Sequence, residues 1–450
     1  MANAYLSRTP SSTGNRRTFT LSAWCKKSSD AQMDLMGAGG SNSQNNIQFA
    51  SDRFQMRKYT SSNVIIVNTD ALLRDRSAWY HVVCAVDTTQ STASNRIKLY
   101  VNGELQSLND TTYPSQDFDW DVNLSGTTMY VGRRGHSDAY FYDGIMAHYH
   151  WIDGTQYAAS DFGETDSTTG IWKPILEPSV TYGTNGFFFK FDNASDFGED
   201  SSGNNNDFSM TNTITQTIDT PSNNFATLNP IDNATAVDFT LSNGNTTLGD
   251  NGSGDNDKGL RATLGVSSGK YYWEIKKLET AGTIGILGSD VSIKDGDVVN
   301  NASSNAYNIG SNGSSSNIVY WQNGNFVNSS ALQGWAANDI MGVALDMDNG
   351  KLFLSINGVF KGFDNNTSDP VNGTNANFTG IATDGTIFIP YAEKRGTANP
   401  SDNYNFGNGY FGTTAVSSAG TNAGVGTFEY DVPSGYKALC TKNINAEEYS

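Results

Sequence analysis

The sequence is poor in cysteine, proline and charge. It holds 3 cysteines and 10 prolines among 450 residues, and an odd number of cysteines without a CxxC pair gives no disulfide framework. Charged residues make up 16% of the chain, and the net charge of −18 opposes binding to nucleic acid. No apolar run of about 18 residues is present, so no membrane contact is predicted. The first residues do not resemble a secretory signal, and we expect none.

Glycine is abundant, with 46 residues, and short alternating apolar stretches are separated by Gly, Asn and Asp clusters. This pattern is typical of β-strands joined by tight turns, and helical periodicity is nearly absent. Strands are predicted at 17–26, 79–87 and 96–101, and Asn102-Gly103 turns the last of these into residues 104–105. Cys25 and Cys84 lie within these apolar patterns, where free cysteines are usually buried.

The second half of the chain shows the same pattern of short apolar stretches separated by turn residues. Residues 269–276 form a predicted strand. A meander is predicted over 340–347, 351–356 and 359–360, with turns at 348–350 and at Asn357-Gly358. The predicted fold class is therefore all-β, with two antiparallel, jelly-roll-like β-sandwich domains joined by a short ordered connector. The expected boundaries are 1–175 for the first sandwich, 176–235 for a connector with one short strand, 236–443 for the second sandwich and 444–450 for a tail.

The predicted sandwich of residues 1–175 contains the segments 19–24 (FTLSAW), 79–83 (WYHVV), 98–103 (KLYVNG) and 142–145 (YDGI). With this ordered set it resembles laminin-G/concanavalin-like lectin domains. It implies a sandwich that presents binding loops, and domains of this kind often hold one Ca²⁺ at the rim.

The predicted sandwich of residues 236–443 contains the segments 269–274 (GKYYWE), 342–346 (GVALD), 351–358 (KLFLSING) and 388–391 (FIPY). With these segments it resembles SPRY domains, which are non-catalytic protein-interaction sandwiches.

Three further segments resemble a module of bacteriophage virion proteins: 200–208 (DSSGNNNDF), 220–230 (TPSNNFATLNP) and 433–441 (PSGYKALCT). The resemblance implies a non-enzymatic, tail-fibre-like structural protein that recognises a host-surface glycan or protein and assembles with other virion proteins. It would be made in the host cytoplasm and reside on the tail or capsid surface, as a homo-oligomer, because one weak site gains from repetition. A capsid decoration or head-fibre protein is the first alternative.

Calcium is the candidate cofactor, because it prefers hard oxygen ligands. Asp34, Asp138 and Asp143 are its candidate ligands, with ordinary turn aspartates as the competing interpretation. Sugar binding requires exposed aromatic rings beside polar groups, and the candidates are Tyr140, Tyr142, Trp321 and Trp335. Core packing is the competing interpretation for each ring.

A glycan hydrolase of concanavalin-like fold is the second alternative. Such enzymes carry two carboxylates that flank the scissile bond. Glu274 and Glu279 approach the required spacing, but Lys276 stands where a third acidic residue is expected, and no catalytic residue is predicted. His148 and His150 share a strand, but no third zinc ligand is evident near them.

Overall fold

The computed structural model describes residues 3–41, 43–60, 62–233, 239–250, 258–280, 282–293, 298, 304–311, 318–328, 334–394 and 401–448. It confirms an all-β architecture built from antiparallel sheets. The chain divides into two compact units, Met1–Gln216 and Thr217–Ser450. Among the described residues, no helix is long and apolar enough to cross a membrane.

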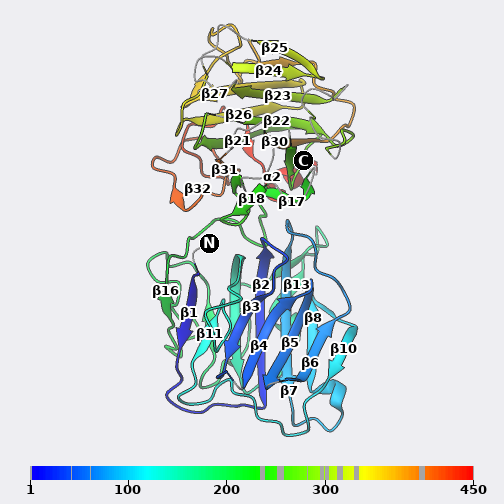
Figure 1. Cartoon of the computed structure of the whole chain (residues 1–450), viewed down its shortest axis with the longest axis vertical. Coiled ribbons are helices and arrows are strands. Elements are labelled where there is room, and N and C mark those ends of the chain that lie inside the picture. The colour runs from blue at the N-terminus through cyan, green and yellow to red at the C-terminus, as the bar shows by residue number, and fades with distance from the viewer. Residues whose placement is uncertain are drawn as a thin grey trace. The chain divides into compact units, whose positions relative to one another are not determined.

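The first unit contains two sheets, named A and B here (Figure 1). The strands of sheet A are, in spatial order, β10 (Leu108–Thr112), β6 (Ser62–Thr69), β5 (Arg53–Thr60), β4 (Gln44–Ala50), β3 (Met33–Ala38), β11 (Met129–Val131), β1 (Tyr5–Arg8) and β16 (Ser209–Thr211). The strands of sheet B are β15 (Phe187–Phe189), β12 (Gly144–Asp153), β2 (Thr18–Lys27), β7 (Trp79–Asp87), β8 (Ile97–Val101) and β9 (Glu104–Leu105). A separate ribbon pairs β13 (Gly163–Thr165) with β14 (Trp172–Pro174), and single 3₁₀ turns lie at Ala93–Asn95 and Ala159–Asp161.

The core of the first unit lies between sheets A and B. Alternate residues of each strand point into it, for example Ile47 and Phe54 from sheet A and Leu21 and Cys84 from sheet B. The alternation predicted β2, whereas β3, β4, β5 and β6 of sheet A were not among the predicted strands. The predicted turn is confirmed, because Asn102 and Gly103 have φ values of 50° and 88°, as a tight hairpin requires.

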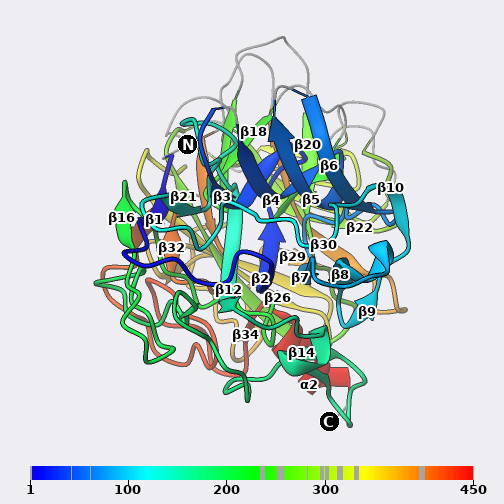
Figure 2. The ribbon, with the colours of Figure 1, turned by 90° about the horizontal axis from the view of Figure 1, so that it is seen from below.

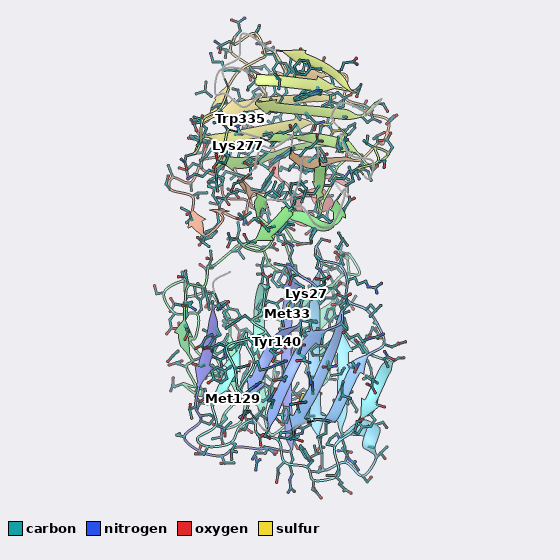
Figure 3. The ribbon with its side chains drawn as sticks, in the orientation of Figure 1. Lys27, Met33, Met129, Tyr140, Lys277 and Trp335 are labelled. Atoms are coloured by element: carbon teal, nitrogen blue, oxygen red, sulfur yellow. The ribbon has the colours of Figure 1, made fainter. Side chains whose placement is uncertain are left out.

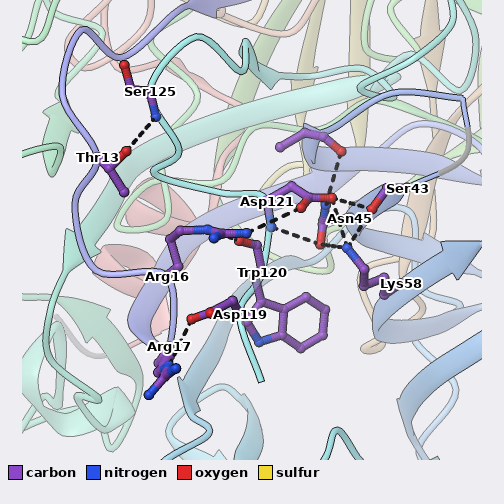
Figure 4. A network of polar contacts seen from close by, with 11 residues as sticks. Thr13, Arg16, Arg17, Ser43, Asn45, Lys58, Asp119, Trp120, Asp121 and Ser125 are labelled. Carbon is purple, nitrogen blue, oxygen red and sulfur yellow. Dashed lines mark hydrogen bonds and ion pairs between the residues drawn. The ribbon is translucent and has the colours of Figure 1, made fainter. Parts of the chain in front are cut away.

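A buried polar network closes one end of this core (Figure 4). Lys58 donates to Asp121 Oδ2 at 2.8 Å and to Asn45 Oδ1 at 3.3 Å. Arg16 pairs with the other Asp121 oxygen at 3.6 Å. The network ties β4 and β5 to the segment before β11, so the buried ammonium group is fully compensated.

The second unit also contains two sheets, named C and D here. The strands of sheet C are β17 (Leu228–Asn233), β20 (Lys258–Ala262), β30 (Phe388–Lys394), β22 (Thr283–Gly288), β23 (Ala306–Ser311), β24 (Ile318–Gln322) and β25 (Asn325–Asn328). The strands of sheet D are β18 (Phe239–Ser242), β19 (Thr247–Asp250), β31 (Asp402–Asn405), β21 (Lys270–Lys277), β26 (Ile340–Asp346), β27 (Lys351–Ile356) and β28 (Val359–Phe360), with β29 (Phe378–Thr379) on β27 and β34 (Lys437–Ala438) on β21. The predicted meander is β26, β27 and β28, and it is confirmed in register.

The ends of the second unit pack onto its sheets. A short ribbon of β32 (Tyr410–Phe411) and β33 (Thr414–Ala415) lies in the C-terminal segment. The expected tail is instead the helix α2 (Thr441–Glu448), whose Ile444 packs against the core. Cys440 is buried beside it, and all three cysteines are buried and free of disulfides.

The expected connector, 176–235, is divided between the two units. Its strand β15 extends sheet B, and β16 pairs with β1 at the edge of sheet A, where both views place it (Figures 1 and 2). Phe208 packs in the first core, whereas Phe225 and Leu228 are buried in the second unit. The part of the segment up to Gln216 therefore belongs to the first unit, and the part after it belongs to the second unit.

Candidate functional site

The two tryptophans predicted as sugar-binding faces are buried. Trp335 is 0% exposed, and the Lys277 ammonium lies 5.2 Å from its ring centroid (Figure 3). Trp321 is 3% exposed and packs against Phe326 on the outer side of sheet C. The prediction for both is wrong, because Trp335 packs in the core and Trp321 packs in a separate apolar cluster on the outer side of sheet C.

The two tyrosines behave differently from each other. The Tyr142 hydroxyl donates to the carbonyl oxygens of Lys26 at 3.1 Å and Ile145 at 3.3 Å, so this residue is an anchor of the sandwich. Tyr140 is 40% exposed. Of the four predicted aromatic residues, Tyr140 is therefore the one that presents a ring to solvent.

The three candidate calcium ligands do not converge. Asp34 is 0% exposed and lies 3.4 Å from Arg134 Nε. Asp138 is exposed and pairs with Arg133, and burial raises the pKa of Asp143. Across the described ranges, no group of three or more His, Cys, Asp or Glu side chains gathers in metal-binding geometry. The predicted Ca²⁺ site is not formed, because Asp34 and Asp138 are each paired with an arginine and the three carboxyl groups do not converge.

The outer face of sheet A instead carries a row of polar side chains that crosses four strands. The pairing register places Asp34 of β3, Gln48 of β4, Gln55 of β5 and Asn68 of β6 side by side. We call these four residues the polar row. Their exposed fractions are 0%, 0%, 6% and 8% respectively, so the row is sheltered although it lies outside the core.

Hydrogen bonds fix the middle of the polar row and leave an acceptor at its β6 end. Gln32 donates to Gln48 Oε1 at 3.0 Å, and Gln48 donates in turn to Gln55. Asn68 Oδ1 is buried and has no hydrogen-bond partner among the described residues. A buried acceptor in this state favours a ligand that can donate a hydrogen bond to it.

A loop of residues 132–143 crosses this face beside the polar row. The crossing is possible because two glycines meet there: a Cβ on Gly37 would collide with the backbone of Gly135, and a Cβ on Gly135 would lie 2.7 Å from Ala38 backbone atoms. A bulge in β3 after Asp34 frees its N–H to donate to the Tyr140 carbonyl at 2.9 Å. The loop can lie directly on β3 because neither Gly37 nor Gly135 has a side chain that would separate the two backbones.

The loop delivers Arg134 and Tyr140 to the β3 end of the polar row, beside Asp34. The Arg134 guanidinium lies 3.5 Å from the Tyr140 ring centroid, a cation–π contact. Tyr140 itself has a φ of 56°, a left-handed conformation that costs a non-glycine residue about 1–2 kcal/mol. The residue is labelled in Figure 3, on the side of the first unit formed by sheet A.

Arg57 of β5 completes the arrangement, one rung further along the sheet from the polar row. It faces Asn46 in the register, and its guanidinium lies 5.2 Å from the Tyr59 ring. Burial, followed by the neighbouring Arg134 guanidinium, lowers the pKa of Arg57. Burial also raises the pKa of Asp34 to about 7, against the opposing effect of Arg134. Arg134 is therefore the guanidinium group in contact with the buried Asp34 carboxyl, at 3.4 Å.

Three of the four histidines, His81, His148 and His150, lie on the outer face of sheet B and serve packing. His81 stacks between Trp24 and Trp172, accepts from Trp172 Nε1 at 3.0 Å, and bonds Ser22 Oγ at 2.9 Å. His150 stacks on Phe188 at 3.9 Å between ring centroids. Burial lowers the pKa of both imidazoles, so both are neutral rings packed under the segment that covers sheet B.

The carboxylates of the hydrolase alternative are separated by their surroundings. Glu274 is 0% exposed and accepts the backbone N–H groups of Glu429 at 2.8 Å and Tyr430 at 2.9 Å. Glu279 is exposed, beyond the end of β21. Glu274 therefore holds the C-terminal segment on sheet D.

Comparison with known families supports the interpretation of the first sandwich. A family model, the Concanavalin A-like lectin/glucanases superfamily, matches residues 2–159. This range covers sheet A apart from β16 and sheet B apart from β15. The laminin-G/concanavalin-like assignment of the first domain is thereby confirmed. No curated protein sequence matches the chain.

Two solved structures resemble part of the chain. The TRIM65 PSpry domain is 16% identical with a TM-score of 0.29, and covers 40% of this chain and 91% of its own. The SPRY domain of human HERC1 is also 16% identical with a TM-score of 0.29, and covers 39% of this chain and 96% of its own. Scores of this size carry no functional argument.

Proposed function

We propose that the first unit is a carbohydrate-binding domain whose site is the polar row together with Tyr140. The observation that carries the proposal is an exposed ring, Tyr140, at the β3 end of the polar row and a buried acceptor without a partner, Asn68 Oδ1, at its β6 end. Sugars offer apolar C–H faces that stack on aromatic rings and hydroxyls that bond to amides. Three interstrand spacings give the polar row a length of about 14 Å, enough for a short run of sugar units.

The proposed role is binding without chemistry. Glycoside hydrolysis needs two carboxyl groups at about 5–10 Å. The polar row contributes one carboxyl, Asp34, which is buried against Arg134. We propose further that this binding serves host recognition on a phage particle, as the tail-fibre-like resemblance implies. A head-decorating position is the alternative.

The binding proposal is tested on a glycan array probed with the full chain, with and without Ca²⁺. Tyr140→Ala and Asn68→Ala should each lower binding about 10-fold, since stacking and a ligand hydrogen bond contribute about 1–2 kcal/mol each. Phe326→Ala, a change at an aromatic side chain that is 56% exposed in the second unit, is the matched control. An array on which the wild-type chain binds no glycan would refute the proposal.

The particle setting is tested separately. Cryo-electron microscopy of intact virions should show copies of the chain at symmetric positions on the tail or the head. Particles that lack the chain would refute the virion role and leave the carbohydrate-binding proposal unaffected.

A further inference from the structure

A lysine, an asparagine and an aspartate meet at one end of the first core (Figure 4). Asn45 of β4 and Lys58 of β5 are cross-strand partners in the register. Lys58 Nζ lies 3.3 Å from Asn45 Oδ1 and 2.8 Å from Asp121 Oδ2. The Lys58 side chain is 8% exposed and Asn45 is 2% exposed. An amine nitrogen therefore lies beside an amide group in a place that water hardly reaches.

One oxygen of Asp121 contacts both nitrogen atoms that an exchange of amide partners would involve. Asp121 Oδ2 accepts from Lys58 Nζ at 2.8 Å and from Asn45 Nδ2 at 3.0 Å. Burial raises the pKa of Asp121, but hydrogen bonds from Lys58 and other neighbouring side chains outweigh it and hold the pKa below its usual range. The carboxylate is therefore ionised and can carry a proton from one nitrogen to the other.

The amide group of Asn45 is held in place for attack by the lysine. The backbone N–H of Asp121 donates to Asn45 Oδ1 at 3.4 Å, the atom on which negative charge would develop. Lys58 Nζ lies 5.6 Å from the Phe118 ring centroid, and Trp120 packs edge-on against that ring. The aromatic side chains shelter the reacting groups, and the fold supplies the proximity that such a reaction requires.

We propose that Lys58 and Asn45 react with each other to form an isopeptide bond between β4 and β5, with Asp121 as the catalytic residue. Asp121 takes a proton from the Lys58 ammonium group, and the amine attacks Asn45 Cγ. The Nζ–Cγ bond forms and the Cγ–Nδ2 bond breaks. Of the two protons that Nζ gives up, Asp121 passes one to the departing Nδ2, and the second leaves with it as ammonium. The step consumes no oxidant, reductant or external reagent.

Arg16 makes the charges of the product balance. The reaction removes the charge of Lys58 and leaves Asp121 ionised, and Arg16 lies 3.6 Å from the other Asp121 oxygen. A neutral amide also replaces a buried ammonium group, whose desolvation is costly. The bond would close residues 45–58 into a covalent loop and restrict the unfolded chain, as a disulfide does. This inference does not depend on the carbohydrate-binding proposal.

The test is intact-mass spectrometry of the full-length chain after folding and subsequent denaturation. The wild-type chain should be lighter than its sequence by the mass of one ammonia molecule. Trypsin should release a branched peptide that joins residues 28–53 to residues 58–74, since it does not cleave after an acylated Lys58. A wild-type chain with its full sequence mass and with the two peptides unlinked would overturn the proposal.

Variants then assign the reaction to these side chains. Lys58→Arg keeps the positive charge beside Asp121 but lacks the nucleophilic amine, so it should show its full sequence mass. Asp121→Asn should slow the loss of ammonia about 100-fold or more, measured by intact mass at successive times after synthesis. Lys277→Arg is the matched control, because Lys277 is a buried lysine of the second unit that pairs with Asp402 at 2.7 Å. It should lose ammonia as the wild-type chain does.

A loss of ammonia that persists in Lys58→Arg would overturn the proposal, because it would come from an asparagine that cyclises elsewhere in the chain. A branched peptide that forms in Asp121→Asn at the wild-type rate would overturn the catalytic assignment of Asp121. The branched peptide of the wild-type chain is a direct readout, so the test remains decisive even if a variant fails to fold.

Discussion

Individual buried carboxyl groups hold the outer segments of the second unit on its sheets. Glu274 accepts two backbone N–H groups and the Tyr272 hydroxyl at 3.1 Å. Asp402 pairs with Lys277 at 2.7 Å, with both side chains nearly inaccessible. Charged residues are usually exposed. Glu274 and Asp402 can be buried because each is compensated by a partner far away in the chain.

Glu274 makes the stability of the second unit depend on pH. Burial raises the pKa of Glu274 from 4.5 to about 7, so the folded state binds its proton more tightly than the unfolded chain. Its contribution to stability is complete below pH 4.5 and is lost as the pH rises through about 7. Glu274→Gln should remove this component, giving a flatter profile of unfolding free energy between pH 4.5 and 7.

Denaturant unfolding at several pH values, followed by tryptophan fluorescence, measures the effect. Glu279→Gln, at an exposed residue, is the control and should keep the wild-type profile. A wild-type profile with the same slope as that of Glu274→Gln would contradict the assignment.

Among the elements, the loop of residues 132–143 determines the proposed site. It lies flat on β3 because Gly37 and Gly135 bring two backbones into contact. Gly37→Ala should push the loop away, lower the stability of the first unit by about 1–3 kcal/mol and weaken glycan binding, since Arg134 and Tyr140 move with the loop. Gly126→Ala is a control for stability loss at a left-handed glycine (φ 76°) with open space around it.

Chemical denaturation and the glycan array together test the Gly37 prediction. Loss of stability with unchanged binding would show that the loop does not position the site.

Part of the strands and turns was predictable from the sequence because their signals are local, but β3, β4, β5 and β6 of sheet A were not predicted. Alternation defines β2, apolar runs bounded by turn residues define β7 and β26, and Asn-Gly pairs define two hairpins. The polar row was missed, although Asn46 and Gln48 alternate with Ile47 and Phe49 in β4. Alternation marks which residues leave the core, but not whether a distant loop then shelters them. The predictions for Trp321 and Trp335 were wrong for the same reason. Whether an aromatic residue beside polar residues is buried or exposed depends on its tertiary neighbours.

At the scale of the whole molecule, the boundary at Gln216 gives a direct prediction. A fragment of residues 1–216 retains β15, β16 and the core side chains Phe187, Phe189 and Phe208, which are at most 3% exposed. It should fold cooperatively. A fragment of residues 1–175 loses all of them and should be unfolded or aggregated, because removing one large core aromatic already costs about 3–5 kcal/mol.

Near-ultraviolet circular dichroism and thermal melting of both fragments measure this difference. Residues 217–450 provide the complementary fragment and should melt as a single unit. Cooperative melting of 1–175 at the temperature of 1–216 would show that the segment after 175 is dispensable for the first sandwich.

The three buried cysteines allow the unfolding of each sandwich to be followed by thiol modification. Cys25 and Cys84 belong to the first core and Cys440 to the second unit. Burial raises the pKa of all three thiols, so alkylating reagents find neither access nor thiolate in the folded molecule. Under partial denaturation, intact-mass measurement would count adducts: two for an opened first sandwich, one for an opened second, three for both. The order in which the two sandwiches come apart can thus be followed without engineering a label.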